Sequence, residues 1–145
     1  MSLQESLQSG QVYDWSDYAK AFGFKEGHFR FAAGVIISRK TNSCLVTTYP
    51  QGGQHIDYRD EWQDGVLHYR GVGTSGDQEF KGKNRSIGEN RYEIHVAENV
   101  AGSQLRYLGR FLCEGYAKAR GLDKDGKERW EYHFHLRPIG QDAPS

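Results

Sequence analysis

Two tyrosines and a carboxylate fall in one short stretch of the sequence that also contains a strong turn signal. Residues 58–71 read YRDEWQDGVLHYRG, and an Asp-Gly pair between alternating residues predicts a two-residue hairpin loop. Such a loop at Asp64-Gly65 pairs Asp60 with Tyr69. Because side chains alternate along a strand, Tyr58, Asp60 and Tyr69 then share one face, together with Trp62 and Leu67 as expected core residues.

Two aromatic rings beside a carboxylate could hold a flat polar ligand between them. An ionised carboxylate only accepts hydrogen bonds, so it suits the exocyclic amino group of an extruded cytosine and disfavours thymine, which presents an acceptor oxygen there. A simpler interpretation stays open. An inward carboxylate costs several kcal/mol unless it is hydrogen-bonded, and Asp60 could be satisfied by a tyrosine hydroxyl or by loop amides alone.

A basic segment follows the hairpin and could bind phosphates. The run Lys81-Gly-Lys-Asn-Arg85 lies between expected strands, and contacts from such residues to phosphates fix register without reading sequence. The candidate phosphate contacts are Arg70, Lys81, Lys83, Asn84 and Arg85, with Arg30 as a weaker one. The alternative is an ordinary solvated basic loop.

The elements that must position these residues are mostly short strands. One helix is expected from Asp14 to Gly23, because Trp15, Tyr18, Ala19 and Phe22 recur on one helical face. Strand-like segments fill much of the remaining chain, and a last hairpin turns at Asp125-Gly126. Its second strand is predicted to bury Trp130, Tyr132, Phe134 and Leu136 and to expose Glu131, His133, His135 and Arg137. The fold class predicted is α+β, a closed or half-closed β-barrel with one or two packed helices.

Length and composition fit one globular domain. The chain has 145 residues, with 19 basic and 19 acidic side chains that cancel and two cysteines. We expect a flexible start at 1–11, a domain at 12–139 and a flexible tail at 140–145. With no signal peptide, no membrane-spanning run and no disulfide framework, a cytoplasmic, nucleoid-associated protein without cofactor or metal is expected.

Several separated motifs, in order, resemble the SRA (YDG) domain family. They are the hairpin above with YRGVG at 69–73, GDQ at 76–78, GKNRSI at 82–87, RYLGRFLC at 106–113 and FHLRP at 134–138. The similarity is to the branch associated with HNH nucleases in bacterial modification-dependent (type IV) restriction systems. Arg70 stands where the family often has threonine or serine.

The resemblance implies a PUA-like barrel that binds double-stranded DNA and flips 5-methylcytosine or 5-hydroxymethylcytosine into a pocket. Tyr58 and Tyr69 match the stacking aromatics, and Asp60 matches the carboxylate on the base edge, with Glu61 as the neighbouring alternative. Gly71 and Gly73 match glycines whose backbone lies close to the base. The resemblance implies a non-catalytic reader, with any nuclease activity supplied by an HNH or other nuclease domain or partner.

The residues also allow three other interpretations. Glu79-Phe-Lys81, with Asp60 or Asp64 upstream, could form a magnesium-dependent nuclease site of the PD-(D/E)xK type. His133 and His135 could bind a metal with a third ligand, although an alternating strand explains them equally. PUA-like barrels also serve as RNA-binding modules, which leaves RNA as an alternative ligand.

Overall fold

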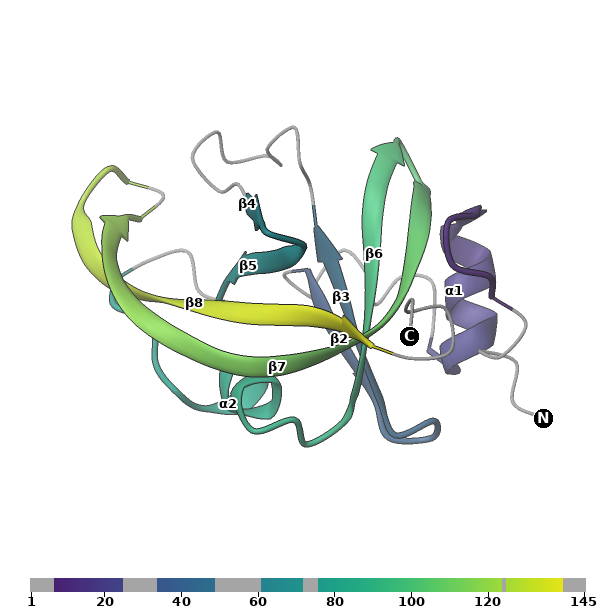
Figure 1. Ribbon diagram of the computed structural model, residues 1–145, viewed down its shortest axis with the longest axis horizontal. Helices are drawn as coiled ribbons and strands as arrows, with labels where there is room; N and C mark the ends of the chain where they lie inside the picture. The colour runs from purple at the N-terminus through teal and green to yellow at the C-terminus, as the bar shows by residue number, and fades with distance from the viewer. Residues whose placement is uncertain (1–6, 25–33, 49–60, 72–75, 124, 140–145) are drawn as a thin grey trace.

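The computed structural model describes residues 7–24, 34–48, 61–71, 76–123 and 125–139. In chain order the elements are as follows: β1 (Val12–Asp14), α1 (Trp15–Phe22), β2 (Val35–Ser38), β3 (Ser43–Thr48), β4 (Glu61–Gln63), β5 (Val66–Arg70), α2 (Gly82–Gly88), β6 (Glu93–Ala101), β7 (Gln104–Leu122) and β8 (Glu128–Ile139). Figure 1 shows β7 and β8 as a long curved hairpin that crosses the molecule, with α1 at one end. No helix among these described residues is long and apolar enough to cross a membrane.

Helix α1 begins and ends where its sequence predicts. The Asp14 carboxylate accepts a hydrogen bond from the Ser16 backbone N–H at 3.3 Å, and the Asp17 carboxylate accepts one from the Asp14 N–H at 3.0 Å. This reciprocal capping satisfies N–H groups that have no partner inside the helix. At the other end Gly23 adopts the left-handed conformation, which glycine tolerates at a helix terminus.

The strands form one eight-stranded sheet in the order β2-β3-β6-β7-β8-β5-β4, with β1 added to β7. Most neighbours are antiparallel, but β3 and β6 run parallel, with Ser43 opposite Glu93 and Thr48 opposite Glu98. Parallel neighbours need a crossover connection. Here the crossover contains β4, β5 and α2, so the predicted site residues of the hairpin and the basic segment all lie within it.

Strands β2 and β3 and the first half of β6 bury both faces. Alternate residues of β2 and β3, such as Val35 and Val46, join an inner core with Tyr69 and Phe134. Their neighbours, such as Ile36, join an outer core beneath α1. Because Tyr69 of β5 and Val35 of β2 share the inner core although their strands lie far apart in the sheet order, the sheet must curl. The predicted barrel-like sheet with packed helices is confirmed.

Packing begins before the boundary expected from the sequence. Leu7 is buried in the outer core, the Gly10 N–H donates to the Tyr107 carbonyl at 2.7 Å, and the Tyr107 N–H donates to the Gln11 carbonyl at 2.9 Å. Residues 7–11, expected to be flexible, therefore lie against β7.

Two tryptophans expected in the core are exposed instead. Trp62 is 40% exposed and Trp130 is 41% exposed, whereas Glu131, expected on the solvent side, is 2% exposed. The physical reason at Trp130 is that β8 continues past the end of β5, whose last pair is Arg70 with His133. Figure 1 shows this end of the β7–β8 hairpin extending past β5. Here residues 76–78 lie along β8, as shown by the hydrogen bond from the Gln78 N–H to the Trp130 carbonyl.

Candidate nucleic-acid interface

The β4–β5 hairpin has the register that the sequence predicts. Gln63 lies opposite Val66, Trp62 opposite Leu67 and Glu61 opposite His68. The next pair would join Asp60 to Tyr69, but Asp60 lies outside the described residues, as do Tyr58, Gly73 and Arg30, and the Glu61 side chain is not described. The structure therefore locates the hairpin and the Tyr69 side of the predicted base pocket.

Tyr69 lies inside the curled sheet. Its side chain is 3% exposed, and its hydroxyl oxygen is 3.5 Å from the Gly34 carbonyl oxygen just before β2. Thr47 of β3 is close by, because its backbone N–H and its hydroxyl both donate to the same carbonyl, at 2.8 and 2.9 Å. The ring is thus held between β5 and the ends of β2 and β3 where the chain passes Gly34 and Thr47.

Gly71 is packed by polar side chains rather than left open. A Cβ atom at this position would lie 2.8 Å from the Asn84 Oδ1, 2.8 Å from the Gln78 Oε1 and 3.2 Å from the Phe134 ring. The Gln78 amide donates to the Gly71 carbonyl at 2.7 Å and accepts from the Tyr132 N–H at 2.8 Å. Gln78 therefore joins the end of β5 to β8, and a side chain at Gly71 would disturb this junction.

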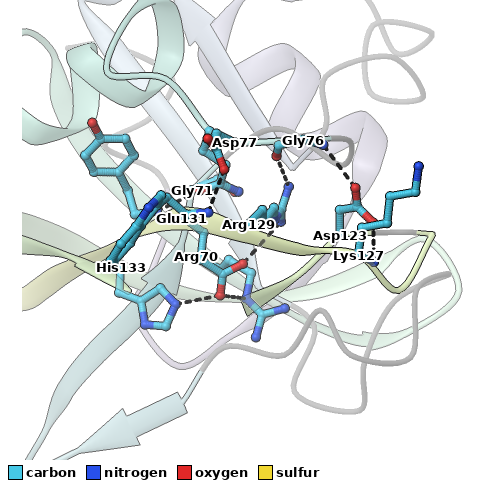
Figure 2. Close-up of polar contacts among 12 residues, drawn as sticks. Arg70, Gly71, Gly76, Asp77, Asp123, Lys127, Arg129, Glu131 and His133 are labelled. Atoms are coloured by element: carbon cyan, nitrogen blue, oxygen red, sulfur yellow. Dashed lines mark hydrogen bonds and ion pairs between the residues drawn. The ribbon is translucent and has the colours of Figure 1, made fainter. Parts of the chain in front are cut away.

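A buried carboxylate organises charged side chains on the other face of β5 and β8. Figure 2 shows Glu131 contacted by Arg70, Arg129 and His133. Its oxygens lie 3.3 Å from Arg70 Nε, 3.2 Å from an Arg129 terminal nitrogen and 2.9 Å from His133 Nε2. Gly121 on β7 makes room, because a Cβ there would collide with the Glu131 carboxylate.

The charge environment keeps Glu131 ionised. Burial raises the pKa of its carboxyl group, but the hydrogen bond from His133 and the charges of Arg70 and Arg129 outweigh burial, so the pKa lies below its ordinary value. Arg70, predicted as a phosphate contact, is therefore an ion-pair partner of Glu131 with a side chain 18% exposed.

The same network fixes the chain after residue 75. Arg129 donates to the Gly76 carbonyl at 3.2 Å, and the Trp130 N–H donates to the Asp77 carboxylate at 2.8 Å. The Gly76 N–H donates to Asp123 in the β7–β8 turn at 3.1 Å (Figure 2). Backbone hydrogen bonds to Asp123 lower the pKa of its carboxyl group. Both described ends of the glycine-rich segment that follows Tyr69 are thus anchored to the β7–β8 hairpin.

The predicted basic loop is a short helix. Residues Gly82–Gly88 form α2, with Ile87 buried in the inner core. Asn84 is 3% exposed and donates to the Glu79 carbonyl at 2.9 Å, so this residue, a predicted phosphate contact, faces the interior. Lys81 and Arg85 are exposed, and Lys83 is half-buried.

The three cations of this segment, Lys81, Lys83 and Arg85, line a pocket of about 850 Å³ beside α2. We call it the basic pocket. It is bounded by α2, the chain after α1 and the β2–β3 turn, and its lining residues are Gly23, Phe24, Ile37, Ser38, Arg39, Lys40, Lys81, Gly82, Lys83, Arg85, Ser86, Arg91 and Tyr92. Six of them are cationic and none is acidic, which is unusual in a chain whose charges cancel.

In the described part of the chain, the residues of the nuclease and metal interpretations do not come together as a metal site. Glu79 and Lys81 pair with each other at 2.9 Å on the surface, with side chains 66% and 73% exposed. Asp64 occupies the exposed β4–β5 turn. His133 is hydrogen-bonded to Glu131, and within the described ranges no three histidine, cysteine or acidic side chains are grouped to hold a metal ion.

The sequence interpretation missed Arg129, Glu131, Gln78 and the cations Arg39, Lys40 and Arg91. The sequence did contain a signal for Arg129 and Glu131, because the Arg-Trp-Glu-Tyr order at 129–132 places these two opposite charges on one face of a strand. The cations of the basic pocket come from segments distant in the sequence, so only the fold brings them together.

Comparison with known proteins identifies relatives of the same fold. The sequence profile of the family described as ScoMcrA-like, SRA domain, matches residues 20–145. No curated protein matches the sequence significantly. Three similar solved structures are the type IV phosphorothioation-dependent restriction endonuclease ScoMcrA (TM-score 0.67, 19% identity), the sulfur-binding and SRA domains of ScoMcrA with phosphorothioated DNA (0.69, 19%), and the SUVH5 SRA domain with methylated CHH DNA (0.67, 18%).

The lengths of these chains differ widely. The similarity covers 92% of this chain in both ScoMcrA comparisons but only 28% and 40% of the ScoMcrA chains. It covers 94% of this chain and 91% of the SUVH5 chain. The chain thus corresponds to one domain of the larger ScoMcrA structures.

Proposed function

Because the chain belongs to the ScoMcrA-like SRA domain family, we propose that it is a DNA reader that extrudes one modified cytosine into a pocket on the β4–β5 hairpin. The proposed base is 5-methylcytosine or 5-hydroxymethylcytosine. Tyr58 and Tyr69 would stack on the extruded base, Asp60 would accept a hydrogen bond from its amino group, and Glu61 is the alternative acceptor. Gly73 would let the backbone approach the base.

The observation that carries the proposal is the hairpin register together with the position of Tyr69. The pairs from Gln63–Val66 to Glu61–His68 follow the predicted order, so one further step would place Asp60 opposite Tyr69. Tyr69 points into the curled sheet. This arrangement supports a pocket that opens from the interior of the sheet toward the chain before β4.

Base stacking alone does not supply the free energy needed to bind an extruded base. Stacking of a base on an aromatic ring contributes roughly 1–3 kcal/mol, and extrusion from a duplex costs a few kcal/mol. The two roughly cancel, so the hydrogen bond to Asp60 and contacts to DNA phosphates must supply the net affinity. We place this reader in a cytoplasmic restriction or defence system, where cutting would come from an HNH or other nuclease domain or partner.

The test compares duplex oligonucleotides that differ only at C5 of one cytosine. We expect the wild-type protein to bind the modified duplex more tightly, and Asp60→Ala to remove the difference. Glu61→Ala tests the alternative acceptor; the predicted strand alternation places Glu61 on the opposite face, so this variant should keep the discrimination if Asp60 is the acceptor. Equal loss in both variants, or full discrimination in Asp60→Ala, would reject Asp60 as the acceptor.

Tyr69 needs a gentler substitution than alanine. The ring is buried in the inner core, and truncation of a large buried aromatic costs about 3–5 kcal/mol. We therefore expect Tyr69→Ala to lose stability as well as discrimination. Tyr69→Phe keeps the ring and should keep the discrimination, measured on protein whose folding is confirmed by circular dichroism.

A further inference from the structure

The basic pocket lies at the opposite end of the β2–β3 pair from Tyr69. The Tyr69 hydroxyl is near Gly34 and Thr47, whereas the basic pocket is lined by Ser38 and the turn that follows it. Four residues of extended chain separate Gly34 from Ser38, which corresponds to about 13 Å. Figure 1 shows the same separation, with α2 and the β2–β3 turn on the lower side and the β4–β5 hairpin on the upper side.

Neighbouring carboxylates neutralise only part of the charge of the six cations in the basic pocket. Arg85 and Arg91 both pair with Glu89, at 3.1 and 2.9 Å, and these hydrogen bonds lower the pKa of the Glu89 carboxyl group. Glu89 lies outside the pocket lining. Glu89 thus orders two guanidinium groups while neutralising one charge, and Glu79 pairs with Lys81 at 2.9 Å. The six cations exceed these two carboxylates by four positive charges, so the pocket stays positive.

The two cations of the β2–β3 turn form no ion pair within the described structure. Arg39 and Lys40 are exposed, and neither forms an ion pair with any residue that the structure describes. Lys83 reaches the pocket from α2, and burial lowers the pKa of its ammonium group, opposed by the nearby Cys44 thiol. An arriving anion would therefore meet a partly desolvated cation at the base and exposed cations at the rim.

The size and the charge of the basic pocket favour a nucleic-acid ligand. A volume of about 850 Å³ exceeds what a single inorganic anion fills and lies in the range of ordinary ligand pockets. Lysine and arginine side chains grouped in this way bind the phosphates of DNA without sequence preference.

We propose that the basic pocket is a second DNA-binding site, which holds phosphates of a DNA segment other than the one that flanks the extruded cytosine. The inference rests on the proposed function in taking DNA as the source of the phosphates. The segment would be either a distant part of the same duplex or a second DNA molecule. In either case the pocket adds affinity for all DNA and leaves the choice of base unchanged.

The test removes the two exposed turn cations. The double variant Arg39→Ala/Lys40→Ala, here called the turn variant, is compared with a control variant. The control is Lys118→Ala/Lys127→Ala, which removes the same charge from the exposed part of the β7–β8 hairpin. Affinity for an unmodified duplex is measured by fluorescence anisotropy as a function of salt. Removal of one cation that binds a phosphate should reduce the slope of log affinity against log salt by about 0.9, so we expect a reduction of about 1.8 in the turn variant and little change in the control.

The outcomes separate this inference from the proposed function. An unchanged slope in the turn variant, or equal reductions in both variants, overturns the second site, because the effect is then absent or due to net charge. A reduced slope with an unchanged ratio of modified to unmodified affinity supports it. If wild-type protein binds the modified and unmodified duplexes equally while the turn variant still has a reduced slope, the proposed base pocket is rejected and the second site is supported.

Two further arms identify the source of the phosphates. If the pocket holds a distant part of the same duplex, the defect of the turn variant should vanish on a duplex trimmed to the base site. If it holds a second molecule, wild-type protein in excess DNA should bind two short duplexes, and the turn variant one. Binding of one short duplex by both proteins, with equal affinity on long DNA, would contradict the proposal.

Discussion

Replacement of Glu131 by glutamine should destabilise the protein far more than its size suggests. The substitution keeps the shape of the side chain and removes the charge that compensates Arg129, which is 1% exposed, and Arg70, which is 18% exposed. Removal of one partner from a buried ion pair costs about 3–5 kcal/mol, because the other charge stays buried. Glutamine retains some hydrogen bonds, so we expect a loss of about 3 kcal/mol, a large part of the 5–15 kcal/mol typical of a domain.

The matched control is Glu114→Gln on the same hairpin. Glu114 pairs with Arg137 at 2.9 Å, but these side chains are 39% and 51% exposed, and exposed pairs contribute about 0–1 kcal/mol. Urea unfolding of the two variants should give a large drop in the midpoint for Glu131→Gln and a small one for Glu114→Gln, with unchanged slopes. Equal drops would refute the assignment of Glu131 as a buried compensating charge.

The pH dependence supplies a second check on Glu131. The folded-state pKa of this carboxyl group lies below its ordinary value of 4.5, so its stabilising contribution is complete above that value and is lost as the pH falls through the folded-state pKa. The difference in unfolding free energy between wild type and Glu131→Gln should therefore shrink in acid. A difference that stays constant to low pH would mean that the charge is not the cause.

Two other predictions concern buried groups. Burial lowers the pKa of His95 from 6.5 to about 4, so the unfolded state alone binds a proton between these values. Stability should fall by about 3 kcal/mol from pH 6.5 to pH 4; His95→Gln should lack this component in urea unfolding, and an unchanged pH profile in that variant would contradict it. Gly71→Ala should lower the unfolding free energy by about 1–3 kcal/mol, because its Cβ would meet Gln78 and Asn84 at 2.8 Å; an unchanged melting temperature would show that both side chains can move aside.

Features set by local chemistry could be predicted from the sequence. The Asp14 cap and the Gly23 terminus define α1, and the Asp64-Gly65 turn fixes the β4–β5 register, since each depends on residues a few positions apart. Helix α2 could not be predicted in this way. It contains Gly82 and Gly88, which are poor helix formers, and it is held by the burial of Ile87.

The faces of β8 show a second limit of sequence interpretation. Strict alternation correctly assigns Tyr132, Phe134 and Leu136 to the core. It fails at Trp130 and Glu131, where the hairpin has left the inner core and Arg70 of β5 pairs with Glu131 on the other face. Whether a strand face is covered there depends on a segment more than fifty positions away, which periodicity within β8 cannot reveal. The same limit applies to the basic pocket, whose cations come from three separate segments.

The parallel pairing of β3 with β6 has a consequence for how this domain can vary. Everything between Thr48 and Glu93 is one long excursion that runs from the end of β3 to the start of the adjacent strand β6, where Glu93 lies opposite Ser43. The entropy cost of closing a flexible loop grows only logarithmically with its length, so even a doubling of one connecting loop within this excursion would cost about 0.6 kcal/mol. New recognition segments can therefore be inserted into this excursion at little thermodynamic cost, while the strands that clamp its ends stay unchanged.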